Sequence, residues 1–253
     1  MTMSASTIAW ILAAGAATAL GGLGLLVLRR PSARWLDGLL GFTAGIMLAA
    51  TAFSLLVPAL DLGEIWEVVL GFALGGATLA ALDRYVPHLH LRFFERGHTL
   101  DDTRRRAFER AGLLVSALTI HNVPEGLAVG VAFAAGGSEL GIPIALAIGI
   151  QNIPEGFAAA APLIQTGVSR RAAAGVAALT GLVEPPAAFA AYFAFEAAAV
   201  LLPVGLAFAA GAMLYVIADE LIPESHARGH ERAATGALLT GFGLMMVLDN
   251  AFG

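Results

Sequence analysis

Long apolar stretches cover most of the chain, and short polar or charged connections separate them. A helix needs about 20 mostly apolar residues to cross the hydrocarbon core of a bilayer. Eight stretches meet this length and are predicted to be membrane-spanning helices, at residues 7–28, 36–60, 65–86, 111–135, 140–165, 172–195, 199–222 and 233–251. The strands of a membrane barrel would instead alternate over about 10 residues. The pattern predicts an all-α polytopic membrane protein in which residues 1–253 form a single transmembrane domain.

Composition and charge exclude several other classes. Of the 253 residues, 58% are hydrophobic and only 13% are charged, whereas soluble domains carry about 25% charged residues. Such high hydrophobicity excludes an intrinsically disordered chain. The absence of cysteine excludes a disulfide scaffold and thiolate chemistry. A formal net charge of −5 argues against a nucleic-acid partner, which would favour a basic surface.

The basic residues predict the orientation. All 14 are Arg, and they lie only in alternate connections, after the first, third, fifth and seventh predicted helices. The other connections and the termini carry acidic residues instead, such as Asp61, Glu139 and Glu196. Because arginines of short loops stay in the cytoplasm, both termini are expected to face outward.

The longest connection is residues 87–110, predicted to be a cytoplasmic loop between the third and fourth helices. It contains His88, His90 and His98 together with several arginines. Two interpretations stay open: a solvated linker whose arginines fix the topology, or a loop whose histidines collect a divalent ion.

A six-residue motif occurs twice near the expected membrane centre, as HNVPEG at 121–126 and as QNIPEG at 151–156. Each copy begins about ten residues from its helix end, which corresponds to a depth of roughly 15 Å. A short connection makes the two helices antiparallel, so the two copies are expected to meet at one depth. Such an arrangement is typical of a transport site built between repeats.

The side chains of these motifs suit a divalent metal. His121 and Glu125 are four residues apart and share one helix face, as do Gln151 and Glu155. Imidazole and oxygen ligands suit zinc and similar metals. Pro124 also frees a backbone carbonyl in the preceding turn. Asn122 and Asn152 add amide oxygens, although each could instead serve as a hydrogen bond between helices.

A third carboxylate, Glu184, is expected at mid-depth of the sixth helix, in the segment GLVEPP at 181–186. The interior of these helices has no basic residue to neutralise Glu125, Glu155 and Glu184. Buried membrane charges are costly and usually functional. Taken singly, His121 or Glu184 could be a structural core residue; together, the carboxylates require a bound cation or protons.

With these motifs, the chain resembles the ZIP family of divalent metal transporters over its whole length, and its bacterial GufA-like branch in particular. The resemblance implies a 3+2+3 bundle with pseudo-twofold symmetry around the fourth and fifth helices, and a binuclear site. One metal would take His121, Glu125, Gln151 and Glu155. The other would take Asn122, Asn152 and Glu184, with Glu125 and Glu155 bridging. Many members have His in place of Gln151, and some have Asp in place of Asn152, so a weaker or retuned site is expected.

Polar residues near the two membrane faces suggest a route through the protein. In the ZIP resemblance, acids and His at the cytoplasmic side line the exit, here Asp83, Asp219, Glu220 and His226. The alternative is an interfacial acidic cluster neutralised by Arg84 and Arg228. Toward the outside, Ser54, Asp61, Glu64 and Glu67 form either an acidic mouth that concentrates cations or an ordinary polar loop.

The sequence therefore predicts a transporter, not an enzyme, that moves divalent transition-metal cations into the cytoplasm of a bacterium across its inner membrane. Zn²⁺ is the first candidate; Cd²⁺, Fe²⁺ and Mn²⁺ are alternatives, and no prosthetic group is expected. Metal and lipid bilayer are the expected partners, and a homodimer stays open. Two other classes remain: a proton- or sodium-coupled carrier of another solute, and an intramembrane metalloenzyme, although no HExxH pair is present.

Overall fold

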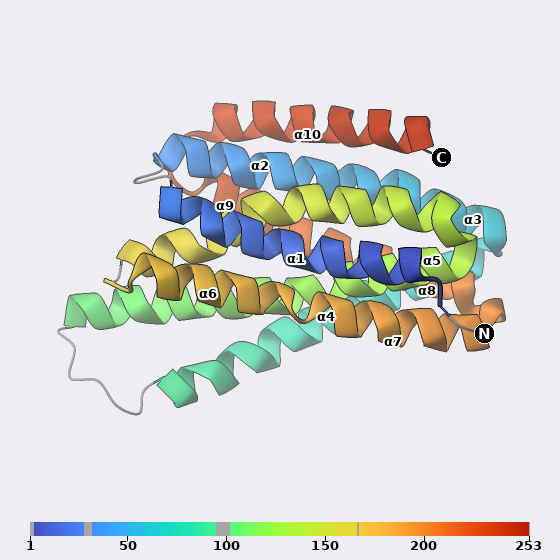
Figure 1. Ribbon diagram of the computed structural model, residues 1–253, viewed down its shortest axis with the longest axis horizontal. Coiled ribbons are helices and arrows are strands. Elements are labelled where there is room, and N and C mark those ends of the chain that lie inside the picture. The colour runs from blue at the N-terminus through green and yellow to red at the C-terminus, as the bar shows by residue number, and fades with distance from the viewer. Residues whose placement is uncertain (1–2, 28–31, 95–101, 166, 253) are drawn as a thin grey trace.

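A computed structural model describes residues 3–27, 32–94, 102–165 and 167–252, and within these ranges the chain is helical with no strand (Figure 1). The first half contains α1 (Ala5–Val27), α2 (Ala33–Ala49), the π-helix η1 (Ala50–Leu56), α3 (Val57–Leu62), α4 (Ile65–Phe94) and α5 (Asp102–Gln165). The second half contains α6 (Arg170–Gly181), α7 (Glu184–Ala197), the 3-10 turn η2 (Ala199–Leu201), α8 (Leu202–Val216), the π-helix η3 (Ile217–Leu221), α9 (Ile222–His226) and α10 (Glu231–Phe252). The predicted all-helical architecture is confirmed.

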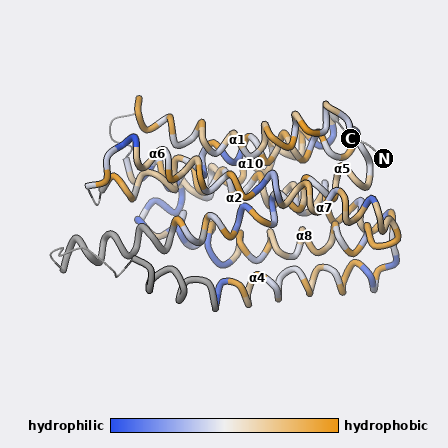
Figure 2. Tube along the Cα trace, turned by 60° about the horizontal axis from the view of Figure 1, so that its bottom comes forward, coloured by the Kyte–Doolittle hydropathy of each residue, from blue (hydrophilic) through white to orange (hydrophobic). Residues whose placement is uncertain are grey.

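Seven helical runs of the described residues are long and apolar enough to cross a bilayer. Several of them join consecutive elements into one rod; α2, η1 and α3, for example, form Ala33–Leu62. Large apolar side chains such as Val27, Ile65 and Leu239 are exposed on the surface of the bundle. Hydrophilic positions lie mostly toward its two ends, with few between them (Figure 2). Such a surface is suited to lipid rather than to water.

The 64-residue helix α5 reverses direction at its middle. Gly136 (φ −131°, ψ 16°) and Gly137 (φ 56°, ψ −133°) leave helical geometry, and Gly137 adopts the left-handed region that favours glycine. The two limbs, residues 102–135 and 138–165, then run back along each other (Figure 1). The apolar part, Leu118–Ala161, holds 44 residues. A straight helix of that length would extend about 66 Å, roughly twice the thickness of a bilayer core.

The helices on either side of the predicted loop 87–110 extend into it. α4 continues to Phe94 and α5 starts at Asp102, so much of this segment is helical. The drop in hydropathy ends the apolar span but not the helix, since residues 88–94 contain neither glycine nor proline. His98 lies outside the described residues, and so do the side chains of His88 and His90.

Glycines join α1, α5, α6 and α7 into a first group of closely packed helices. Gly156 of α5 lies directly against the backbone of Thr18 in α1, and Gly126 lies against the backbone of Glu184 in α7. A Cβ atom at either glycine would overlap main-chain atoms. Small residues permit this approach in lipid, where helices gain nothing from hydrophobic exclusion.

The second group consists of α2, α3, α4, α8, α9 and α10 with their π-helical turns. Gly45 of α2 packs on the backbone of Leu238 in α10, and Gly75 of α4 packs on the backbone of Phe208 in α8. At several glycines an added Cβ would overlap the backbone of another helix. Among the described glycines, the two helices of each such contact belong to the same group. The two groups meet through side chains, as in the edge-to-face pair Trp35–Phe157 with ring centroids 4.8 Å apart.

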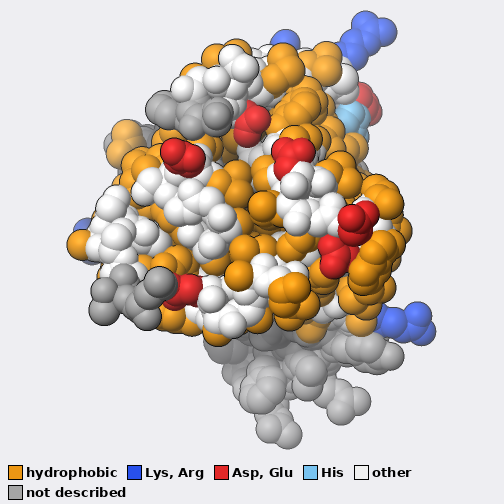
Figure 3. Space-filling view, turned by 90° about the vertical axis from the view of Figure 1, so that its right-hand side faces the viewer, with side chains coloured by type: hydrophobic (Ala, Val, Ile, Leu, Met, Phe, Trp, Pro, Cys, Tyr) orange, Lys and Arg blue, Asp and Glu red, His pale blue; other side chains and the backbone are white. Residues whose placement is uncertain are grey.

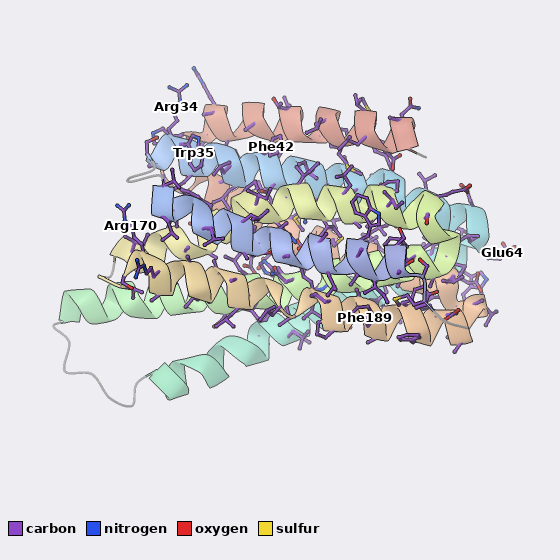
Figure 4. All side chains as sticks on the ribbon, in the orientation of Figure 1. Arg34, Trp35, Phe42, Glu64, Arg170 and Phe189 are labelled. Atoms are coloured by element: carbon purple, nitrogen blue, oxygen red, sulfur yellow. The ribbon has the colours of Figure 1, made fainter. Side chains whose placement is uncertain are left out.

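The two ends of the bundle differ in charge. Arg34 and Arg170 lie at one end, which we call the arginine end, and Glu64 lies at the other (Figure 4). α1 begins and α10 finishes at the end of Glu64 (Figure 1). A view onto that end shows carboxylates scattered among apolar side chains (Figure 3). Arg34 and Arg170 therefore lie at the opposite end of the described structure from the start of α1 and the end of α10.

Candidate metal centre

The residues predicted for the metal site lie on three helical segments of the first group. The first limb of α5 carries His121, Asn122 and Glu125, the second limb carries Gln151, Asn152 and Glu155, and α7 begins at Glu184. All seven side chains are buried, with relative exposures of 3% or less. The reversal of α5 and the contact of Gly126 with the α7 backbone place these segments side by side.

Amide groups link the carboxylates of the cluster to neighbouring helices. Gln151 Nε2 donates a hydrogen bond of 2.7 Å to Glu125 Oε1 and so joins the two limbs of α5. Asn152 Nδ2 donates to both carboxylate oxygens of Glu184, at 2.9 and 2.8 Å, and to the carbonyl oxygen of Ala14 in α1 at 3.0 Å. The amides hold the carboxylates in place without neutralising them.

Thr18 is a member of this cluster that the sequence analysis missed. Its Oγ1 donates a 3.2 Å hydrogen bond to Glu184 Oε1, and its side chain is buried. After Thr7, it is the only hydroxyl- or amide-bearing side chain in α1, an otherwise apolar helix. That isolation was the one available signal, since nothing in the local sequence relates Thr18 to a residue 166 positions away.

The cluster contains an unusual concentration of buried polar atoms that have no partner within the protein. They are His121 Nδ1, Asn122 Nδ2 and Oδ1, Glu125 Oε2, Gln151 Oε1, Asn152 Oδ1, and both carboxylate oxygens of Glu155. In the rest of the described chain, only the hydroxyls of Thr43 and Thr51 share this property. Buried polar atoms almost always have a partner, and each one left alone costs about 1–3 kcal/mol. All but Asn122 Nδ2 can offer an electron pair to a cation.

The repulsion among the buried carboxylates calls for a bound cation or for protons. Glu125 and Glu155 are close enough to repel one another, and Glu155 also faces Glu184. The described residues contain no three His, Asp or Glu side chains that already converge on one metal position. To bind an ion, the imidazole and the carboxylates, which now contact amide groups, would have to move toward one another. The amide oxygens would then complete the ligand set.

The cluster opens toward the arginine end through a cavity of about 350 Å³. His121 and Glu220 both line this cavity, and His121 Nε2 contacts Glu220 Oε1 of η3 at 2.5 Å. Asp219 also lines the cavity, and Asp83 of α4 lies within electrostatic range of both acids. The structure therefore brings Asp83, Asp219 and Glu220 together beside the predicted metal site.

His226 does not join this group. Its Nδ1 contacts the carbonyl oxygen of Ile222 at 2.8 Å, and its Nε2 contacts Thr235 Oγ1 of α10 at 3.1 Å. Both ring nitrogens are therefore engaged at the junction of α9 and α10. His226 is thus absent from the described residues that line the cavity with Asp219 and Glu220, and its role in the exit stays a prediction. The sequence analysis in turn missed Glu224, which lines the cavity where His226 was expected.

Toward the opposite end, the polar residues are more dispersed. Ser54 of η1 is buried and donates a 2.6 Å hydrogen bond to Asp249 of α10. Asp61 and Glu64 are exposed, and the Glu64 backbone N–H bonds to Glu67 Oε2 at 2.9 Å. Ser54 is thus paired with a residue that the sequence analysis did not assign to the outer mouth.

An all-helical bundle with an apolar surface and a buried polar core defines an integral, multi-pass membrane protein. Comparison with known proteins specifies the family. Residues 95–249 match the ZIP zinc transporter family. The chain is 44% identical to the zinc transporter GufA of Myxococcus xanthus, over 99% of this chain and 100% of that protein. It is 45% identical to the zinc transporter ZIPB of Bordetella bronchiseptica, over 94% of this chain and 78% of that protein. Human zinc transporter ZIP11 is 33% identical over 93% of this chain and 94% of its own length. The chain belongs to the ZIP family, as its motifs predicted.

Proposed function

We propose that this protein transports divalent transition-metal cations, Zn²⁺ first among them, across the bacterial inner membrane into the cytoplasm. The observation that carries the proposal is the set of partnerless, electron-pair-donating atoms buried between α5 and α7. A divalent cation would satisfy these atoms and offset the repulsion among the three carboxylates. The relatives named above as zinc transporters support Zn²⁺ as the cargo.

The topology that we propose has eight crossings, because each limb of α5 is long enough to span the bilayer once. The arginine end would face the cytoplasm and both termini would face outward. The helices before α5 and those after it would form the two outer triplets of a 3+2+3 bundle. The opposite placement of arginines and termini supports this orientation.

The proposed site holds two metal ions. His121, Glu125, Gln151 and Glu155 would bind one, and Asn122, Asn152 and Glu184 the other, with Glu125 and Glu155 between them. Metal binding would compete with the Gln151–Glu125 and Asn152–Glu184 hydrogen bonds, since the same carboxylate oxygens serve in both. Moderate affinity is useful here, because a transported ion must also leave its site.

Movement between the two helix groups would give the site alternating access. The metal ligands lie on the first group, whereas Asp83, Asp219 and Glu220 lie on the second. Close backbone contacts through glycine stay within each group, and side chains fill the boundary between them. Sliding one group of helices past the other should therefore cost less free energy than separating the helices within either group. The His121–Glu220 contact crosses this boundary and would pass metal toward the cytoplasm.

The test is zinc flux into proteoliposomes containing the purified protein. Glu125→Gln/Glu155→Gln keeps the shape of the cluster and removes two charges, so flux should fall to background. Glu139→Gln is the matched control, because Glu139 lies on the same helix but is exposed. Flux that persists in the double variant would refute the site. A wild-type protein that carries no divalent ion, while still binding zinc, would instead favour a metalloenzyme; flux of another solute would favour a coupled carrier.

A further inference from the structure

Among the described residues that line the cavity between His121 and the arginine end, one carries a fixed positive charge. The polar lining of the cavity includes the carboxylates of Asp219, Glu220 and Glu224, and the guanidinium of Arg228. Arg228 follows α9 and lines the cavity on the side that would face the cytoplasm in the proposed orientation. A fixed positive charge is unexpected on the proposed path of a metal cation. The contacts of Arg228 indicate what this charge does.

A buried carboxylate, Asp37, and a half-buried one, Glu224, hold the guanidinium in position. Arg228 Nη1 donates to Asp37 Oδ1 of α2 at 2.8 Å and to the Glu224 carbonyl oxygen at 3.2 Å, and Nη2 pairs with the Glu224 carboxylate. The side chain of Asp37 is completely buried, and its second oxygen contacts His230 Nδ1 at 3.0 Å. Burial alone would lower the pKa of Arg228, but the hydrogen bond with Asp37 and the charge of Glu224 outweigh it and raise that pKa above its ordinary value. The guanidinium is therefore always charged.

The groups around Arg228 are those that bind zinc elsewhere. Asp37, Glu224 and His230 offer two carboxylates and an imidazole, a ligand combination typical of zinc sites. As they stand, no three such side chains in the described structure converge on one metal position. The guanidinium lies between Asp37 and Glu224 and bonds to both, so it occupies the space where their oxygens would meet around an ion.

We propose that Arg228 takes the place of a metal ion at the mouth of the exit cavity, and so makes this mouth a point of release instead of a third binding site. The proposal rests on the transport function proposed above. Asp37 and Glu224 carry two negative charges against the single positive charge of Arg228, so these three groups together leave a net negative charge beside the path of a departing cation. Without Arg228, Asp37, Glu224 and His230 would close on zinc and retain it, and release would become slow.

The experiment measures zinc bound per chain at equilibrium, and zinc flux in proteoliposomes, for wild type and Arg228→Gln. We expect the variant to bind one further zinc ion per chain and to transport about tenfold more slowly, as for an ion held about tenfold more tightly. Adding Glu224→Gln should abolish the additional binding, because a ligand is lost. Arg228→Lys keeps the cation and should bind zinc as wild type does. Arg232→Gln, an exposed arginine four residues further on, is the control.

Two results would overturn the proposal. One is Arg228→Gln protein that is folded and binds no additional zinc; the other is additional zinc that survives Glu224→Gln. If Arg228→Gln is unstable because Asp37 is left charged and buried, Asp37→Asn/Arg228→Gln removes both charges. It should bind zinc and transport like wild type, and lost flux in this variant would contradict a role in release. Absence of zinc flux in wild type itself would refute the transport function, whereas the binding measurement on Arg228→Gln would still report on the mouth.

Discussion

Replacing Gly156 by Ala tests whether close helix contact builds the metal site. Gly156 lies against the backbone of Thr18, and a Cβ atom would overlap main-chain atoms that cannot rotate away. α1 would have to move outward, which strains the Asn152–Ala14 and Thr18–Glu184 hydrogen bonds. The matched control is Gly175→Ala on α6, where a Cβ would meet nothing within 4 Å.

The expected magnitudes separate the two variants. Both gain about 1 kcal/mol of helix propensity. Gly156→Ala also loses up to about 3 kcal/mol through overpacking and about 0.6 kcal/mol for each disturbed interhelical hydrogen bond. The free energies of unfolding should therefore differ by roughly 3–4 kcal/mol, with Gly175→Ala the more stable. At about 2–4 °C per kcal/mol for a chain of this size, the melting temperatures should differ by about 6–16 °C.

Thermal unfolding in detergent, followed by circular dichroism, gives this comparison, and zinc flux gives its functional counterpart. Gly175→Ala should melt at or above the wild-type temperature and retain flux. Gly156→Ala should melt at a lower temperature than wild type. Its zinc flux should also fall, because the strained hydrogen bonds hold Asn152 and Glu184 in place. Equal melting temperatures for the two variants would refute the argument that α1 and α5 approach so closely at Gly156 that no Cβ atom fits between them.

Three further predictions concern metal and its route. Zinc at a hundredfold excess over its dissociation constant should stabilise the folded protein by about 2.7 kcal/mol, so the melting temperature should be higher with zinc than with a chelator. Equal melting temperatures would mean that the buried atoms without a partner are not metal ligands. His226→Ala should retain flux while Glu220→Ala loses at least about tenfold, because Glu220 contacts His121 whereas His226 contacts Ile222 and Thr235; equal losses would place His226 in the exit path. Gln151→His adds an imidazole and should tighten zinc binding measured by calorimetry about tenfold; weaker binding would place residue 151 outside the ligand set.

The spans and the motif were predictable from the sequence because each depends on local pattern. Lipid acts on every residue separately, so long apolar runs mark the helices whatever they pack against. The reversal at Gly136 and Gly137 falls between the two helices predicted for residues 111–135 and 140–165. The helical positions of His121, Glu125, Gln151 and Glu155 likewise follow from spacing alone.

One difference between the expected and the observed positions coincides with a local feature of the backbone. The ZIP resemblance grouped His226 with Asp219 and Glu220, and residues 217–221, which precede His226, form a π-helix. A π-helical turn inserts an extra residue and rotates every later side chain about the axis. Glu224 therefore lines the cavity, and His226 faces Thr235.

The remaining contacts were decided by tertiary packing. The Thr18–Glu184, His121–Glu220 and Asp37–Arg228 contacts join residues 166, 99 and 191 positions apart. Nothing in the neighbourhood of one partner specifies the other, because each contact depends on which helices approach and how closely. Glycines set that approach, and it brings donors from separate helices to one depth. The sequence by itself determined which groups are available to a metal, and only the folded structure decided which of them face each other and which, as at Arg228, are already occupied.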